Sequence, residues 1–264
     1  PSGKFVYVVN KLSNSISAYS VDTSTGALAS IDADGSTTAY DASIATKSTP
    51  ISIAIDHSGS HAYVANAGIS ASTSNVSVYS IDSLTGALTA IPATGVPGTS
   101  TFISTGGTTP NSVEVSPDDK LLYVTNRGSN NITSFIIGSA GELTYSSMST
   151  AHVTNDNPVS IAIDSTGINI YVVNTGNNTV SLYHANTAGV LAYQSSLATG
   201  TTPISITIDS TGQYVYVANY GSNDISVYSV AGGTLALVNC GGGTSCNGSY
   251  FKAGTTPNAI TTSP

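Results

Sequence analysis

Tyr123-Val124-Thr125-Asn126 is one of five copies of a phrase that runs aromatic residue, valine, small or branched residue, asparagine. The asparagines that end successive copies are 56, 60, 48 and 45 positions apart. Self-similarity at such spacings is typical of repeat architectures, in which one supersecondary unit recurs along the chain. The five copies end at Asn10, Asn66, Asn126, Asn174 and Asn219.

A second phrase begins with proline and also occurs five times. Its best copies, such as Pro158-Val-Ser-Ile-Ala-Ile, alternate apolar and small or polar residues with period two. This alternation predicts a strand, and proline suits the first residue of a strand because it donates no ladder hydrogen bond. The phrase starts at Pro50, Pro110, Pro158, Pro203 and Pro257.

One complete unit extends from Pro203 to Val238. Turn residues (Gly, Asn, Asp and Ser) divide it into four short segments, and they favour positive φ or bond their own backbone. Four short antiparallel strands per repeat describe one blade of a β-propeller, so the predicted fold class is all-β. The four predicted strands, A to D in chain order, are Ile204–Ile208, Tyr214–Ala218, Ile225–Val230 and Leu235–Val238.

The two ends of the chain lead us to expect a closed ring. The first repeat begins at a strand B, and the segment that starts at Pro257 is a strand A with no strand B after it. Pairing the two would complete the first blade and leave no open sheet edge. We therefore predict one propeller domain, residues 1–264, with repeats at about 1–49, 50–109, 110–157, 158–202 and 203–256, and with 257–264 completing the first blade. A fragment of a longer propeller is the alternative.

Composition excludes several classes of function. The chain has six Lys and Arg residues and a net charge of −8, which argues against nucleic-acid binding. No apolar stretch approaches the ~20 residues of a membrane helix, so we expect no membrane span. The histidines show no zinc-site spacing, and we predict no cofactor.

Cys240 and Cys246 are the two cysteines of the chain, and a glycine-rich spacer separates them. A disulfide between them is the favoured prediction, and two free thiols or half of a metal site are the alternatives. A structural disulfide indicates an extracellular or cell-surface location.

The whole pattern, from the leading proline through Tyr-Val-x-Asn to Ile-Ser-Val-Tyr-Ser and Thr-Gly-x-Leu, resembles the YVTN β-propeller repeat family. The resemblance covers essentially the whole chain. It implies the propeller fold and two kinds of relative, namely lactonase-like propellers similar to 6-phosphogluconolactonase and exported surface-layer proteins. Such relatives usually have seven blades, so five copies are a departure that weakens the transfer of any active site.

The asparagines that end the phrase are candidate binding residues, because the ends of the B strands would meet at one rim of the propeller. Arg127 directly follows one of them and could clamp a carboxylate or a phosphate. The competing interpretations are that each asparagine caps its own turn and that Arg127 is a solvated surface residue. The candidates are Asn10, Asn66, Asn126, Arg127, Asn174 and Asn219.

Glu114 is the weak catalytic candidate, because it stands at a strand A position where the other repeats have alanine or threonine. A buried carboxylate there would have a raised pKa and could act as an acid or a base. Asp32 and Asp34 are weak metal candidates that, with Asp41, partly resemble a calcium loop, although ordinary turn chemistry is favoured and we predict no metal.

Three functions remain open at this point. The favoured hypothesis is a non-enzymatic, secreted structural or adhesive module that binds protein surfaces, identical subunits in a surface assembly among them. It rests on the scarcity of convergent ionisable groups and on two long polar connections, 32–48 and 92–109. The alternatives are a lactonase-like hydrolase and a carbohydrate-binding propeller that uses Tyr19, Tyr79, Tyr183 and Tyr228.

Overall fold

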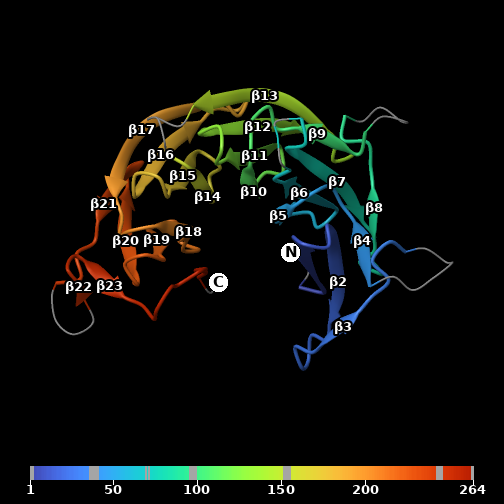
Figure 1. Ribbon diagram of the computed structural model, residues 1–264, viewed down its shortest axis with the longest axis horizontal. Coiled ribbons are helices and arrows are strands. Elements are labelled where there is room, and N and C mark those ends of the chain that lie inside the picture. Colours follow the sequence, from blue (N-terminus) through green and yellow to red (C-terminus); the bar gives the residue numbers. More distant parts are fainter. Residues whose placement is uncertain are drawn as a thin grey trace. The chain divides into compact units, whose positions relative to one another are not determined.

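The computed structural model describes residues 3–35, 42–68, 70, 72–94, 100–150, 156–241 and 246–262, with the backbone alone at 150, 246 and 247. This part of the chain forms strands and turns and contains no helix, which confirms the all-β prediction. Its strands form five antiparallel sheets, one for each predicted repeat (Figure 1).

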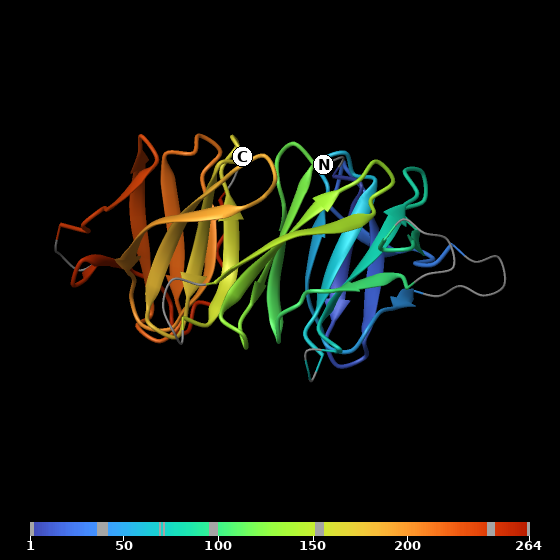
Figure 2. The same cartoon turned by 90° about the horizontal axis from the view of Figure 1, so that it is seen from above.

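The third and fourth sheets are simple four-stranded meanders in chain order (Figure 2). The third contains β10 (Pro110–Val115), β11 (Leu121–Asn126), β12 (Asn131–Ile137) and β13 (Leu143–Thr150). The fourth contains β14 (Pro158–Ile163), β15 (Asn169–Asn174), β16 (Thr179–Ala185) and β17 (Leu191–Ala198). These are the strands A, B, C and D of the predicted blade.

In the other three sheets two short strands pair with strand C in place of one continuous strand D. In the first sheet both β3 and β4 pair with β2, at opposite ends of it. The second sheet repeats this with β8 and β9 on β7, and the fifth with β21 and β23 on β20. The predicted long connections therefore contain sheet strands, and inserted residues between the two halves account for the longer repeats.

The strands of these three sheets have the following bounds. The first sheet contains β1 (Phe5–Asn10), β2 (Ser15–Val21), β3 (Leu28–Ser30) and β4 (Ser43–Ala45). The second contains β5 (Pro50–Ile55), β6 (His61–Asn66), β7 (Asn75–Ile81), β8 (Leu88–Ala90) and β9 (Phe102–Ser104). The fifth contains β18 (Pro203–Ile208), β19 (Tyr214–Asn219), β20 (Asp224–Ala231), β21 (Thr234–Leu237), β22 (Cys246–Asn247) and β23 (Tyr250–Lys252).

The leading proline of each strand A pairs with the asparagine that ends strand B. Pro110 lies opposite Asn126, and the register then shifts by one residue before Ser112. The same bulge follows Pro50, Pro158 and Pro203. Proline is tolerated there because its missing N–H lies at the start of the strand. Both phrases therefore recur because the same pairing of proline with asparagine, followed by a bulge, is built in four of the sheets.

Two compact units divide the chain, Pro1–Ser129 with Thr133–Ser147, and Asn130–Ile132 with Met148–Pro264. In the first unit, apolar residues of neighbouring sheets form a core that includes Tyr63, Val113, Leu122 and Phe135. In the second unit, Tyr171, Val173, Val217 and Tyr228 belong to a similar core between the fourth and fifth sheets. Alternate residues of the strands supply these contacts, as the period-two pattern predicts.

The last segment lies beside the first strand of the fifth sheet, within the second unit. The Ile260 N–H donates to Ser205 Oγ at 3.2 Å, much as the Val113 N–H of β10 donates to Ser52 Oγ of β5 at 3.3 Å. The segment thus lies beside β18 as a strand A of a further blade would, but residues 257–262 form no strand. The predicted closure, in which this segment completes the first blade, is not shown.

Candidate active site

The asparagines of the repeated phrase lie inside the blades. Asn66, Asn126, Asn174 and Asn219 have no exposed surface, and Asn10 is partly buried. In all five the Nδ2 group donates to a hydroxyl of strand C, for example from Asn174 to Ser181 Oγ at 2.8 Å and from Asn219 to Ser226 Oγ at 2.8 Å. The acceptor stands seven residues later in four of them and eleven residues later, at Ser77, for Asn66. These amides tie strand B to strand C, which favours their structural interpretation over ligand binding.

A second series of asparagines joins successive repeats, and the sequence analysis missed it. Asn178 has a φ of 57°, and its Oδ1 accepts the N–H of Thr202 at 2.8 Å. Asn14, Asn130 and Asn223 make the same bond to Thr49, Asn157 and Thr256, each of which precedes the proline of the next strand A. These asparagines stand four residues after the phrase, a regular spacing that could have revealed them.

We predict that Asn178→Ala lowers the free energy of unfolding by about 2 kcal/mol. Alanine loses a hydrogen bond worth about 1 kcal/mol and is strained at a positive φ, where asparagine is tolerated. Asn178→Gly is the matched control, because glycine accepts this φ but also lacks the bond. Urea unfolding should rank the wild type, Asn178→Gly and Asn178→Ala in falling order of stability. Equal stability of all three proteins would mean that the hydrogen bond from Thr202 to Asn178 does not stabilise the fold.

Arg127 is exposed and lies in the turn between β11 and β12. Its backbone N–H donates to the carbonyl of Thr109 at 3.0 Å, which fixes the turn. No carboxylate of the described residues forms an ion pair with its guanidinium group. The side chain is therefore available to a ligand or to solvent.

Glu114 lies on β10, opposite Tyr123 of β11. Its neighbours Val113 and Val115 point into the core of the first unit, so Glu114 lies on the other face of the sheet. The side chain is partly buried, and among the described residues no hydrogen bond or ion pair reaches its carboxylate. Burial raises the pKa of Glu114 to about 7, so at neutral pH this group can both accept and release a proton.

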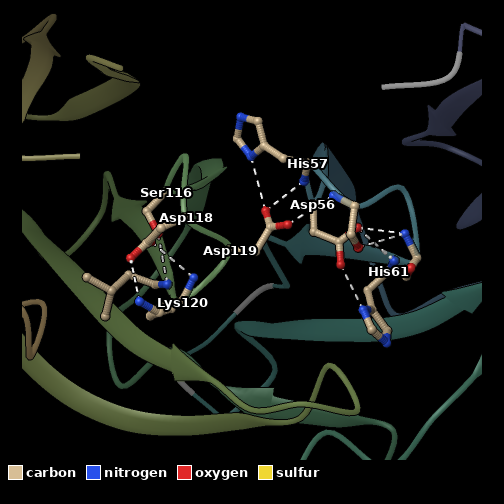
Figure 3. Close-up of polar contacts among 10 residues, drawn as sticks. Asp56, His57, His61, Ser116, Asp118, Asp119 and Lys120 are labelled. Carbon is tan, nitrogen blue, oxygen red and sulfur yellow. Dashed lines mark hydrogen bonds and ion pairs between the residues drawn. The ribbon is translucent and has the colours of Figure 1, made fainter. Parts of the chain in front are cut away.

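Two of the four histidines, His57 and His61, lie at the turn between strands A and B of the second sheet, and among the described residues neither pairs with Glu114. His61 Nδ1 lies 2.8 Å from Asp56 Oδ2, and His57 Nδ1 lies 3.1 Å from Asp119 Oδ1. Figure 3 shows both pairs. Asp119 also accepts the backbone N–H groups of His57 and Ser58, which joins the turns of the second and third sheets. We interpret these two histidine–aspartate pairs as structural contacts that hold the turns in place.

Burial opposes the ionisation of Asp56, but hydrogen bonds from His61 and Ser60 outweigh it and keep the pKa of this carboxyl below its ordinary value. His184 lies in β16, and His152 lies outside the described residues.

Asp32 and Asp34 line a cavity of about 690 Å³ in the first unit, together with Phe5, Asp82 and Leu84. Within the described ranges, no three His, Cys, Asp or Glu side chains come together in a way that could hold a metal ion. Asp41, the third residue of the suspected calcium loop, lies outside these ranges. The cavity therefore supplies no metal site from described residues.

The remaining candidates divide into buried tyrosines and a cysteine pair. Tyr79, Tyr183 and Tyr228 are almost fully buried, which leaves their ring faces inaccessible to a sugar. The side chain of Cys246 lies outside the described residues, so the predicted disulfide to Cys240 stays a prediction, and so does the extracellular location inferred from it. In the described residues no helix is long and apolar enough to cross a membrane.

Comparison with known protein families identifies the chain. Its sequence matches the family described as "Lactonase, 7-bladed beta-propeller" over residues 1–144, 98–192 and 157–240, which together extend over most of its length. The chain belongs to this lactonase family. The match leaves untested the narrower resemblance to YVTN repeats. No curated protein sequence matches the chain.

Solved structures of similar fold lead to the same architecture. A protein of Bacteroides uniformis ATCC 8492, provisionally named a 6-phosphogluconolactonase, superposes with a TM-score of 0.75 at 18% identity, covering 98% of this chain and 71% of that one. A protein of Bacteroides fragilis NCTC 9343 with the same provisional name gives 0.75 at 19% identity over 98% and 70%. The periplasmic gluconolactonase of Pseudomonas aeruginosa gives 0.68 at 16% identity over 90% and 69%. At these identities the likeness shows the fold alone.

These comparisons correct two predictions. The family is described as seven-bladed, whereas the described residues form five sheets, so five blades do not represent the complete ring of this family. The favoured hypothesis of a non-enzymatic surface module is wrong, because the family points to a lactonase-like hydrolase. That hypothesis rested on the scarcity of convergent ionisable groups, and it gave little weight to a single carboxylate, Glu114, whose pKa burial raises to about 7.

Proposed function

We propose that this protein hydrolyses a small sugar lactone, with Glu114 as the general base. Membership of the lactonase family is the observation that carries the proposal. Glu114 supports it, because its pKa of about 7 suits proton transfer at neutral pH. In a propeller the blades surround a central channel. The proposal takes the first strand of each blade to lie nearest to this channel, so that Glu114 of β10 would meet the substrate there.

The proposed step is the attack of water on the lactone carbonyl carbon. The Glu114 carboxylate takes one proton from the water as the new C–O bond forms, and the carbonyl oxygen becomes an alkoxide. The ring C–O bond then breaks, and the leaving ring oxygen takes up a proton from the Glu114 carboxylic acid. The product is the open hydroxy acid, and Glu114 returns to its starting state.

We predict that Glu114→Gln lowers kcat/KM for a sugar lactone by about 100-fold or more, because general base catalysis contributes roughly 10²–10⁴ in rate. In the wild type kcat/KM should rise with pH through about 7, since the base must be deprotonated. Initial rates after subtraction of spontaneous hydrolysis, from pH 5 to pH 8, measure both effects.

Glu142→Gln is the matched control, because Glu142 is the other glutamate of the chain and its carboxylate accepts the N–H of Ala140 within a turn. This variant should keep the wild-type rate and pH profile. Equal rates for the wild type and Glu114→Gln would remove Glu114 from the mechanism, and no turnover by the wild type would refute the proposed function.

A further inference from the structure

Asp119 stands at a position of the turn between strands A and B where three other sheets have glycine. In all four turns the N–H of this residue donates to the carbonyl three residues earlier, at 2.9 Å. The φ angle is 58° at Asp119 and 73°, 71° and 70° at the glycines. Glycine adopts such a φ freely, whereas aspartate is strained there and needs a compensating contact. The glycines are Gly59, Gly167 and Gly212.

The Asp119 carboxylate makes its contacts with the second sheet, inside the first compact unit. Its Oδ1 accepts the backbone N–H of His57 at 2.6 Å, and its Oδ2 accepts that of Ser58 at 2.9 Å. The His57 ring adds a third contact, with Nδ1 at 3.1 Å from Oδ1 (Figure 3). His57 also departs from the repeat, so two exceptional residues meet between two sheets. The corresponding residues of the other turns are Pro117, Ser165 and Ser210.

A second histidine lies at the same junction of the second and third sheets. His61 Nδ1 is 2.8 Å from Asp56 Oδ2, within its own sheet. A Cβ added to Gly141, in the turn between β12 and β13, would collide with the His61 ring, so the ring packs directly on this glycine. Both histidine–aspartate pairs therefore belong to one contact between neighbouring repeats.

Carboxylates outnumber basic groups around the two histidines. Burial, together with the charges of three of these carboxylates, raises the pKa of Tyr63 above its ordinary value, so all three act on one buried hydroxyl. A fourth, Asp118, pairs with Lys120 at 3.4 Å. Among the described residues, four carboxylates and one lysine thus face the histidines, and protonation of either histidine reduces the excess of negative charge. The first three carboxylates are Asp56, Asp119 and Glu142.

We propose that this junction is pH-sensitive and that it is tightest when His57 is protonated. Histidine side chains in general change charge near pH 6.5, so at about pH 5–6 an imidazolium faces the Asp119 carboxylate. Exposed ion pairs are usually weak, because two side chains must be ordered. Here His57 is 57% exposed and Asp119 only 27%, and two backbone donors already hold the carboxylate. Above pH 7 the neutral ring offers at most an uncharged donor, and the junction loosens.

The test is a double-mutant cycle of the wild type, His57→Ser, Asp119→Gly and the double variant. Serine and glycine are the residues of other repeats at these positions, so the turns keep their conformation. At pH 5.5 the summed losses in Tm of the single variants should exceed the loss of the double variant by about 2 °C, as for one charged pair. At pH 8 the excess should fall below half of that. Glu114 and His61 are present in all four proteins, so their own titration cancels.

Asp119→Asn is the matched control. Asparagine tolerates the left-handed φ and keeps an acceptor oxygen but has no charge. In this background His57→Ser should change the Tm equally at pH 5.5 and pH 8. Hydrogen exchange supplies a local readout, because the His57 and Ser58 amides donate to Asp119. Corrected for intrinsic rates, their protection should be about threefold higher at pH 5.5 than at pH 8 in the wild type, and should not change with pH in Asp119→Asn.

Three results would overturn the inference. An equal excess at both pH values would indicate an ordinary hydrogen bond, and no excess at pH 5.5 would mean that the pair contributes nothing. A larger excess at pH 8 would reverse the proposed direction. If the inference holds, raising NaCl from 0.05 to 0.5 M reduces the excess at pH 5.5, because salt screens the pair. None of these measurements uses a lactone, so the inference stands or falls separately from the proposed function.

Discussion

Phe135→Ala is expected to lower the free energy of unfolding by about 3–5 kcal/mol, the usual cost of truncating a buried aromatic residue. Phe135 lies on β12, has no exposed surface, and belongs to the core formed with Val78, Val113 and Leu122. The deletion removes apolar contacts from three strands or more and leaves a cavity that rigid sheets cannot collapse to fill. Thermal unfolding should shift down by roughly 10 °C.

Tyr145→Ala is the matched control for this prediction. The Tyr145 ring meets the Phe135 ring edge to face, with 6.2 Å between the centroids, but Tyr145 is 49% exposed. Its removal should cost about 1 kcal/mol, the value of the aromatic contact and part of its burial. If both variants lost the same small amount of stability, Phe135 would not belong to a tightly packed core.

Glu114→Gln is expected to stabilise the protein at pH 8 while it removes activity. The folded-state pKa of Glu114 is about 7, whereas a glutamate in an unfolded chain titrates at about 4.3. The folded state therefore binds the proton more tightly than the unfolded state. The stability that this protonated group contributes is complete below about pH 4.3 and is lost as the pH rises through 7.

The size of the effect follows from the pKa difference. The difference between a pKa of about 7 and one of about 4.3, at 1.36 kcal/mol per pKa unit, corresponds to roughly 3–4 kcal/mol at pH 8. This figure is an upper limit, because the Glu114 side chain keeps some contact with solvent. Glutamine has the same shape and no charge, so the variant should be more stable than the wild type at pH 8 and nearly equal to it at pH 4.5.

Guanidinium chloride unfolding of both proteins at the two pH values measures this difference. Glu142→Gln should show no such pH-dependent gain, since its carboxylate belongs to an accessible turn. A variant less stable than the wild type at pH 8 would mean that the Glu114 carboxylate has a favourable partner, and it would contradict the raised pKa. A gain in stability combined with lost activity is the expected signature of a group kept for function.

The sequence predicted the architecture well and the site poorly. The predicted strands of the last full repeat agree with β18, β19, β20 and β21 to within one or two residues. The split fourth strands were not predicted, because β4 and β9 are three-residue strands within polar connections and carry no periodic signal of their own. Only their pairing with β2 and β7 makes them strands.

The candidate site shows the same division. Glu114 was singled out from the sequence because it departs from the repeat, but its pKa depends on burial by residues distant in the chain. The asparagines that end the repeated phrase suggested a ligand-binding site. A polar residue also recurs in every repeat when each repeat needs the same internal hydrogen bond, and that is the role these asparagines have. Only the folded structure brings the amide of Asn219 within hydrogen-bonding distance of Ser226, to which it donates.

By itself the sequence determined the fold class, the number of repeats in the chain and the strand order within each repeat. These features depend on the alternation of apolar residues, on turn residues and on self-similarity between repeats, all of which can be read directly from the order of the residues. Tertiary structure decided which polar groups are buried, which asparagines join neighbouring repeats, and that the Glu114 carboxylate is desolvated with no partner among the described residues. Burial and hydrogen-bond partners are sums over residues far apart in the chain, so no local pattern contains them.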